Sequence, residues 1–159
     1  MTLHIRAGER ADVPLIAELI RGLAKYERLE DEVTMTEAKL DRALFGERAY
    51  AETLIAEDGG GAVGFALFFH NFSTFLAQPG IYLEDLFVLP EHRGEGVGKA
   101  LLEKLAQLAV ERECGRLEWA VLDWNKSAIG FYERLGAKPN SEWTVYRLTG
   151  EYLRALAGK

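Results

Sequence analysis

A cluster of glycines after an arginine is the first feature of this sequence that predicts chemistry. Gly94, Gly96 and Gly98 follow Arg93 at the start of an amphipathic stretch. Glycine lets backbone N–H groups approach an oxyanion closely, and a helix N-terminus adds positive potential. The segment is therefore interpreted as a cradle for a pyrophosphate group, the alternative being a tight turn that only leads into a helix.

Two common phosphate-binding motifs do not fit this segment. A P-loop needs glycine at the position of Arg93 and serine or threonine at that of Ala100. A dinucleotide-binding fingerprint needs glycine where Lys99 stands. The pattern that remains is Arg-x-x-Gly-x-Gly, formed by Arg93, Gly96 and Gly98.

Two neighbouring carboxylates lie late in an apolar stretch just before this loop. Glu84 and Asp85 belong to Ile81–Val88, whose composition is typical of a buried strand. Side chains alternate between the faces of a strand, so Glu84 and Asp85 are expected to point to opposite faces. We therefore do not expect them to form a paired acid and base.

Composition and charge limit the class of protein. The 159 residues, 48% of them hydrophobic, suit one domain with a core. The apolar stretch Ala62–Phe69 is too short to span a bilayer, and no secretory signal is visible, so we expect a cytoplasmic protein without a membrane partner. A net charge of −6 argues against a nucleic-acid partner and for cationic ones. Cys114 is the only cysteine and the histidines are scattered, so we expect no metal.

Periodicity predicts the elements that must position these residues. Strands are expected at His4–Ala7, Thr53–Ala56, Val63–Phe69, Ile81–Val88, Leu117–Leu122 and Trp143–Leu148. Helices are expected from Asp12 to Tyr26, Thr34 to Leu44, Val97 to Arg112, Asn125 to Leu135 and Glu151 to Leu156. No linker or repeat divides the chain. The expected fold class is α/β, a single domain 1–159 with a mixed, mostly antiparallel twisted sheet flanked by helices.

Local signals mark several boundaries within this scheme. Asp12 is expected to cap the first helix, and Thr34 and Glu37 have the spacing of a capping box for the second. Asn125 is expected to cap a short helix, and Gly136 is a natural left-handed stop after it. The segment Asn71–Gly80 is expected to be a loop because it contains serine, threonine, proline and glycine.

The glycine motif and the segments around it resemble those of the GNAT acetyltransferases. The matching segments are Leu86-Phe87-Val88, Arg93-x-x-Gly96-x-Gly98, Asp123-Trp124-Asn125 and Ala128-x-x-Phe131-Tyr132-x-x-x-Gly136-Ala137. Two segments, Ala24–Glu27 and Tyr82–Asp85, are similar to the spermidine/spermine acetyltransferases. Ala120–Asn125 and Leu156–Lys159 look closer to the related thialysine N-epsilon-acetyltransferases. The resemblance covers nearly the whole chain.

This resemblance implies acetyl-CoA as cosubstrate and assigns residues to it. The implied cofactor-binding residues are Leu86, Phe87, Val88, Arg93, Gly94, Glu95, Gly96, Val97, Gly98, Lys99, Asn125, Lys126, Ser127, Ala128 and Tyr132. An alkylamine has a pKa near 10.4, so about one molecule in two thousand is neutral at pH 7 and the site must remove a proton. Glu84 is the candidate for that step, directly or through water. Tyr132 is the implied general acid for the leaving thiolate, and the amide of Leu86 or Val88 is implied to polarise the thioester carbonyl.

The resemblance also implies a substrate pocket and a homodimer. The implied substrate-binding residues are Tyr26, Glu27, Glu84, Asp85, Glu118, Trp119, Ala120 and Trp143. The expected substrate is a small cationic amine: a diamine, a polyamine or a lysine-like molecule such as thialysine. The loop Asn71–Gly80 and the short segment before Trp143 depart from the polyamine enzymes, which leaves the amine open. A protein or peptide N-acetyltransferase and a non-catalytic acetyl-CoA-binding regulatory module are the alternatives.

Overall fold

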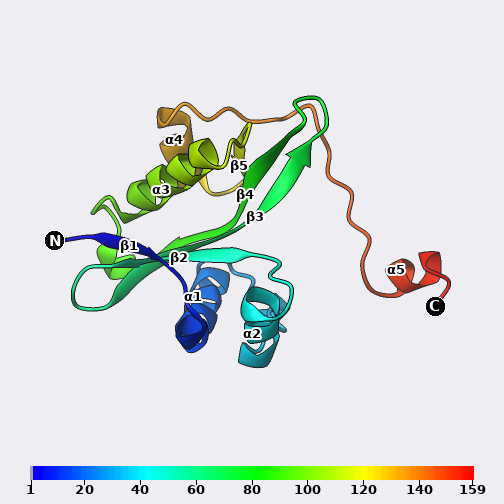
Figure 1. Ribbon diagram of the computed structural model, residues 1–159, viewed down its shortest axis with the longest axis horizontal. Helices are drawn as coiled ribbons and strands as arrows, with labels where there is room; N and C mark the ends of the chain where they lie inside the picture. The colour runs from blue at the N-terminus through cyan, green and yellow to red at the C-terminus, as the bar shows by residue number, and fades with distance from the viewer. Residues whose placement is uncertain (1) are drawn as a thin grey trace. The chain divides into compact units, whose positions relative to one another are not determined.

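A five-stranded sheet organises the first of the two units into which this chain divides. The computed structural model describes residues 2–159; the first unit ends at Ala120 and the second is Val121–Lys159. The strands follow one another in chain order across the sheet (Figure 1). They are β1 (His4–Ala7), β2 (Glu52–Glu57), β3 (Ala62–Ser73), β4 (Gln78–Val88) and β5 (Leu117–Trp119).

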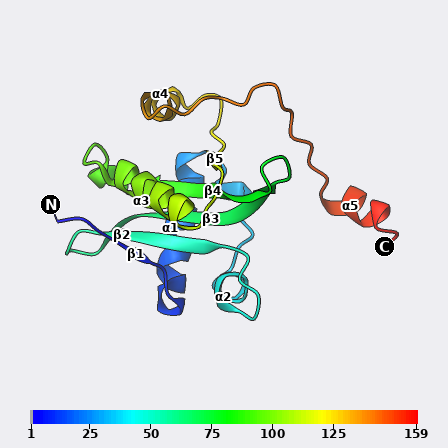
Figure 2. The same cartoon turned by 45° about the horizontal axis from the view of Figure 1, so that its top comes forward.

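Neighbouring strands run antiparallel except for the last pair, in which β5 lies parallel to β4. Figure 2 shows β5 beside β4, at the edge of the sheet opposite β1. Parallel strands need a crossover connection, and the helix α3 (Val97–Glu111) supplies it. The sheet is therefore mixed and mostly antiparallel, which confirms the α/β fold class expected from the sequence.

Helices cover both faces of this sheet. α1 (Val13–Tyr26) and α2 (Glu37–Phe45) lie on one face and α3 lies on the other (Figure 1). Successive side chains of β4 point to opposite faces of the sheet: Phe87 packs against Gly22 of α1, whereas Val88 faces Gly98 of α3. The core between the sheet and the first two helices includes Ile16, Leu19, Leu23, Leu40, Leu44, Ile55, Phe65 and Phe87. Among the described residues, no helix combines the length and apolar composition that a membrane crossing requires.

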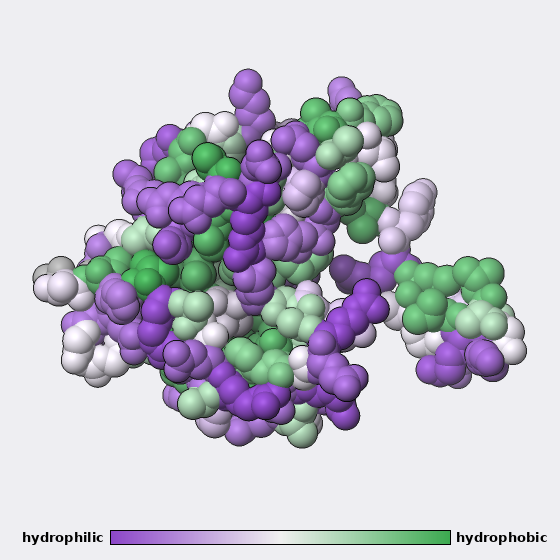
Figure 3. All heavy atoms as spheres, in the orientation of Figure 1, coloured by the Kyte–Doolittle hydropathy of each residue, from purple (hydrophilic) through white to green (hydrophobic). Residues whose placement is uncertain are grey.

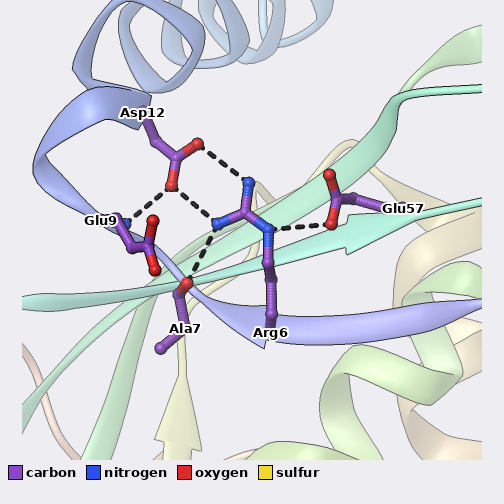
Figure 4. A network of polar contacts seen from close by, with 5 residues as sticks. All are labelled: Arg6, Ala7, Glu9, Asp12 and Glu57. Atoms are coloured by element: carbon purple, nitrogen blue, oxygen red, sulfur yellow. Dashed lines mark hydrogen bonds and ion pairs between the residues drawn. The ribbon is translucent and has the colours of Figure 1, made fainter.

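One arginine joins the first strand to the start of α1. The Arg6 guanidinium donates hydrogen bonds to both carboxylate oxygens of Asp12, at 2.8 and 2.9 Å, and to Glu57 at 2.8 Å (Figure 4). The hydrogen bonds from Arg6 lower the pKa of Asp12. Asp12 precedes α1 as expected, but the expectation that its side chain caps this helix is wrong, because it binds Arg6 and the amide of Glu9 instead.

The second helix begins two residues later than its capping-box pattern predicts. Thr36, and not Thr34, is the N-cap of α2, and its Oγ1 accepts a hydrogen bond from the Lys39 amide at 3.2 Å. The residue before this cap, Met35, packs on the same core as Leu40 in the next turn. This is the residue pattern of a hydrophobic staple, which favours Thr36 over Thr34 as the cap.

The hairpin of β3 and β4 is longer than the sequence predicts. The segment expected to be a loop, Asn71–Gly80, is mostly paired strand: Asn71 lies opposite Gly80 and Ser73 opposite Gln78. The turn is therefore only residues 74–77. Glycine, proline and asparagine are frequent in turns, but here the partner strand supplies the backbone hydrogen bonds that keep the chain extended.

The second unit contains two helices and no strand. α4 (Lys126–Arg134) begins at its expected cap, where Asn125 Oδ1 accepts a hydrogen bond from the Ala128 amide, and Gly136 follows it with φ 94°. α5 (Gly150–Leu156) lies near the expected terminal helix. The strand expected at Trp143–Leu148 is wrong, because those residues are irregular and Val121–Lys159 contains no strand with which they could pair.

Candidate active site

The glycine loop presents open backbone at the start of α3. Gly94 and Gly96 have φ values of 82° and 85°, in the left-handed region that favours glycine. Gly96 is the N-cap of α3, and no side chain caps this helix. A Cβ atom at either glycine would meet no atom within 4 Å. The loop therefore offers unobstructed amides and the positive end of a helix, as expected of an anion cradle.

Arg93, the first residue of the motif, contacts protein groups beside this loop. Its Nε donates a hydrogen bond to the carbonyl of Val88 at 3.1 Å. Its guanidinium carbon lies 4.3 Å from the centroid of the Tyr26 ring and 5.6 Å from that of Phe87. Arg93 thus connects the end of β4 to the last turn of α1, joining a residue expected to bind cofactor to one expected to bind substrate.

The edge of β4 is unpaired within the first unit after Leu83. β5 pairs with β4 only at Ile81, Tyr82 and Leu83, and it ends at Trp119, three residues before the expected Leu122. The Leu89 amide donates to the Val63 carbonyl on the β3 side. Because amide directions alternate along a strand, the amides of Leu86 and Val88 point to the other edge. These are the two amides expected to contact the cofactor.

A register shift in β4 changes the expected arrangement of the two carboxylates. Asp85 lies opposite Leu67 and Leu83 lies opposite Phe68, so Glu84 has no partner in the ladder. Such a bulge interrupts the alternation of side chains. Both carboxylates interact electrostatically with Glu27 at the end of α1. The expectation that Glu84 and Asp85 do not form a paired acid and base stays a prediction.

Glu27, Glu84 and Asp85 form a carboxylate cluster in which burial and repulsion raise the pKa values of Glu27 and Asp85. Burial raises the pKa of Asp85 to about 6, with further contributions from Glu84 and Glu27. Burial also raises the pKa of Glu27, and Glu84 adds to it. A group with such a pKa can both attract a cation and accept a proton near neutrality. Sequence reasoning treated Asp85 only as a substrate contact, because neither its burial nor the bulge is visible in the residue order.

The negative charge extends toward β5. Burial raises the pKa of Tyr82, with contributions from Glu84 and Glu118. Glu118 is less available to a substrate, because its Oε1 accepts hydrogen bonds from Asn71 and pairs with Arg116, each at 3.0 Å. Its neighbour Trp119 is half-buried and Ala120 is exposed. Of the acidic residues expected to bind substrate, Glu118 thus already has protein partners.

We expect Asp85→Asn to stabilise the protein above pH 6 and not at pH 4. The folded-state pKa of Asp85 is raised from 3.8 to about 6, so the folded chain binds the proton more tightly than the unfolded one. The stabilising effect of that proton is present at pH 4 and is lost as the pH rises toward 6. At pH 7.5 the free energy of unfolding of Asp85→Asn should exceed that of the wild type by about 1–3 kcal/mol. Denaturant unfolding from pH 4 to 8 measures it, with the exposed Asp123→Asn as control, and a gain of equal size at every pH would contradict this assignment.

A cavity of about 720 Å³ lies beside α1 in the first unit. Its lining includes Tyr26, Phe87 and Arg93, but none of the three clustered carboxylates. Most of the other lining residues are apolar or glycine: Leu15, Leu19, Gly22, Gly60, Gly61, Ala62, Leu89 and Pro90, with Glu18 and Lys25. The Arg93–Tyr26 stack therefore forms one wall of this cavity.

The remaining expected site residues lie in the second unit. Tyr132 is half-buried near the end of α4, and its ring centroid is 5.6 Å from that of Phe131. Lys126 and Ser127 form the exposed first turn of α4 after the Asn125 cap. Trp143, expected to line the substrate pocket, is 75% exposed in the irregular segment. No group of three or more His, Cys, Asp or Glu side chains that could hold a metal ion occurs in residues 2–159.

Comparison with known proteins finds similar acetyltransferases. Residues 17–137 match the model of the acetyltransferase (GNAT) family. The chain is 40% identical to thialysine N-epsilon-acetyltransferase from Bos taurus, covering 98% of this chain and 97% of that protein. It is 33% identical to L-ornithine N5-acetyltransferase NATA1 from Arabidopsis thaliana, covering 98% and 88%. An integron cassette protein from the V. cholerae mobile metagenome superposes with a TM-score of 0.83 at 27% identity, covering 100% and 99%.

These matches confirm the family indicated by the motifs. The family model spans both the glycine loop and the Asn125–Tyr132 segment. A human spermidine/spermine N(1)-acetyltransferase-like protein is 32% identical over 97% of this chain, although the match covers only 24% of that protein. The relatives therefore belong to both branches that the sequence resembles. The chain belongs to the GNAT family and is an acetyltransferase enzyme.

Proposed function

We propose that this enzyme transfers the acetyl group of acetyl-CoA to a primary amine of a small cationic substrate. The observation that carries the substrate class is the carboxylate cluster Glu27, Glu84 and Asp85 beside the open edge of β4. A site of this charge attracts ammonium groups and disfavours anionic acceptors. The names of the relatives support thialysine, ornithine and spermidine-like amines as the class to test.

The residues present suit acetyl-CoA, which supplies an activated acetyl thioester when bound. The amides from Gly94 to Lys99 would hold its diphosphate, because the loop face is open and the helix is uncapped. The outward amides of Leu86 and Val88 would hold its pantetheine arm and polarise the thioester carbonyl. Asn125, Lys126, Ser127 and Ala128 form the second expected contact segment, at the start of α4.

The carboxylates prepare the amine for attack. They bind the ammonium form, which predominates at pH 7, and one of them then accepts its proton, directly or through water. Glu84 is the exposed member of the cluster, whereas Asp85 is half-buried and its pKa of about 6 suits a proton acceptor. The neutral nitrogen forms a bond to the acetyl carbon and loses a second proton to solvent, and the carbon–sulfur bond breaks. Tyr132 donates a proton to the departing thiolate and recovers one from solvent.

A substrate panel with Glu27→Gln tests the charge argument. We expect this variant to lower kcat/KM about tenfold for thialysine, ornithine and spermidine, since it removes one of the three clustered charges, an effect of order 1.4 kcal/mol. An uncharged arylamine should change by less than twofold. Glu111→Gln at the exposed end of α3 makes the same substitution and serves as control.

Two results of that panel would contradict the proposed substrate class. The first is a higher kcat/KM for the arylamine than for any dication. The second is an unchanged kcat/KM for every cationic substrate in Glu27→Gln. Preferential acetylation of a peptide in the same panel would instead favour a protein N-acetyltransferase.

We further propose that the enzyme acts as a homodimer through its C-terminal segment. Tyr152, Leu153 and Leu156 are 78%, 52% and 79% exposed, and Figure 3 shows an apolar surface on α5. An apolar face of this kind is typical of an interface. Light scattering should give twice the 17.8 kDa chain mass, and the double variant Leu153→Asp, Leu156→Asp should give a monomer. A monomeric wild-type protein at assay concentration would contradict the dimer.

A further inference from the structure

A carboxylate lies inside the segment that is expected to bind an anion. Glu95 stands between Gly94 and Gly96, the two glycines with left-handed backbone conformations. Its side chain is 42% exposed. A free carboxylate beside these amides would repel a diphosphate, so the cradle needs a way to hold this charge aside.

His92 makes the contact that holds it. Its Nδ1 lies 3.0 Å from Oε2 of Glu95. Because a carboxylate can only accept a hydrogen bond, Nδ1 carries the proton and donates it. His92 is the last residue of the short helix Pro90–His92, directly before the loop, and its side chain is 27% exposed.

Asp58 lies near the same ring nitrogen of His92. Its Oδ2 lies 3.8 Å from His92 Nδ1, and its side chain is 18% exposed. The position of Asp58 is itself set by the β2–β3 turn, where its Oδ1 accepts a hydrogen bond from the Gly60 amide at 3.0 Å and its own amide donates to the Gly61 carbonyl. One ring nitrogen of His92 thus lies near two carboxylates, that of Asp58 in the β2–β3 turn and that of Glu95 in the loop.

We propose that His92 is a positioning residue for acetyl-CoA, which it serves by holding the Glu95 carboxylate away from the amides that take the diphosphate. This inference rests on the proposed use of acetyl-CoA. His92 itself does not touch the cosubstrate; it acts through Glu95. Removing the histidine frees the carboxylate to turn over the loop, whereas removing the charge of Glu95 makes the histidine dispensable.

A double-mutant cycle tests this by acetyl-CoA affinity, measured by titration calorimetry without amine. We expect His92→Ala to weaken acetyl-CoA binding about tenfold when Glu95 is present. In the Glu95→Gln background we expect the same His92→Ala substitution to change acetyl-CoA affinity less than twofold. His4→Ala, an exposed histidine on β1, is the matched control.

S-Acetylpantetheine, which lacks the diphosphate, separates positioning from a general loss of structure. The wild type, His92→Ala, Glu95→Gln and the double variant should all bind S-acetylpantetheine with equal affinity. Equal acetyl-CoA affinity in the wild type and His92→Ala would overturn the inference, and so would a tenfold loss on adding His92→Ala to Glu95→Gln. A wild-type protein that binds no acetyl-CoA would overturn the proposed function as well, which distinguishes the two failures.

Discussion

Replacing Tyr132 by phenylalanine is expected to lower kcat by about 10²–10⁴-fold, the usual contribution of a general acid. The thiolate of the departing group has a conjugate acid near pKa 8.5, so without a proton donor it remains able to re-attack the acetyl group. The phenol hydroxyl is the one group this substitution removes. Because the ring stays in place beside Phe131, binding of the amine and of acetyl-CoA should change little.

Steady-state kinetics at saturating substrates and calorimetric binding of acetyl-CoA measure the two parts of this prediction. Tyr146→Phe is the matched control, since Tyr146 lies in the same unit and is 93% exposed. Its kcat should equal that of the wild type. A loss below threefold in Tyr132→Phe would exclude an essential acid role, and a parallel loss of acetyl-CoA affinity would point to a packing role for the ring.

Replacing Gly96 by aspartate is expected to weaken acetyl-CoA binding more than a hundredfold. Gly96 has φ 85°, where a side chain costs about 1–2 kcal/mol, and it is the N-cap of α3. A charge of the same sign as the diphosphate at about 4 Å adds up to about 4 kcal/mol at an effective dielectric constant near 20. Each 1.4 kcal/mol is about a factor of ten in affinity.

Two further variants separate the causes of this loss. Gly96→Ala introduces the backbone strain without the charge, so its effect should be about tenfold. Gly158→Asp introduces both the strain and the charge at a glycine outside the loop, with φ 76° and open space around its Cβ position. Acetyl-CoA affinity should not change in this variant. An unchanged affinity in Gly96→Asp would mean that the diphosphate does not bind at this loop.

Features with local physical causes were predictable from the sequence. Asn125 caps α4 because its side chain reaches an amide three residues away, and the glycines before Val97 open α3 as expected. The second helix shows the limit of such local rules. Two threonines compete for its cap, and the choice of Thr36 depends on the packing of Met35 against the core.

The chemistry of the carboxylates was decided by tertiary structure. Residue order places Glu84 beside Asp85, but the bulge opposite Leu67 and Phe68 depends on pairing with a distant strand. Glu27 joins them only because α1 ends near this part of β4. Desolvation and like charge then raise the pKa of Asp85, and both are properties of the packed chain.

The family and the open glycine loop at the start of α3 were therefore determined by the sequence itself, because backbone conformation and helix capping act over a few neighbouring residues. The expectation of a strand at Trp143–Leu148 was wrong because strand formation is not a local property. β-Branched and aromatic residues favour extended backbone, but a strand exists only where another strand accepts its hydrogen bonds. The sheet edge beyond Leu83 and the acidic cluster beside it likewise depend on partners far away in the sequence, so only the tertiary structure decided them.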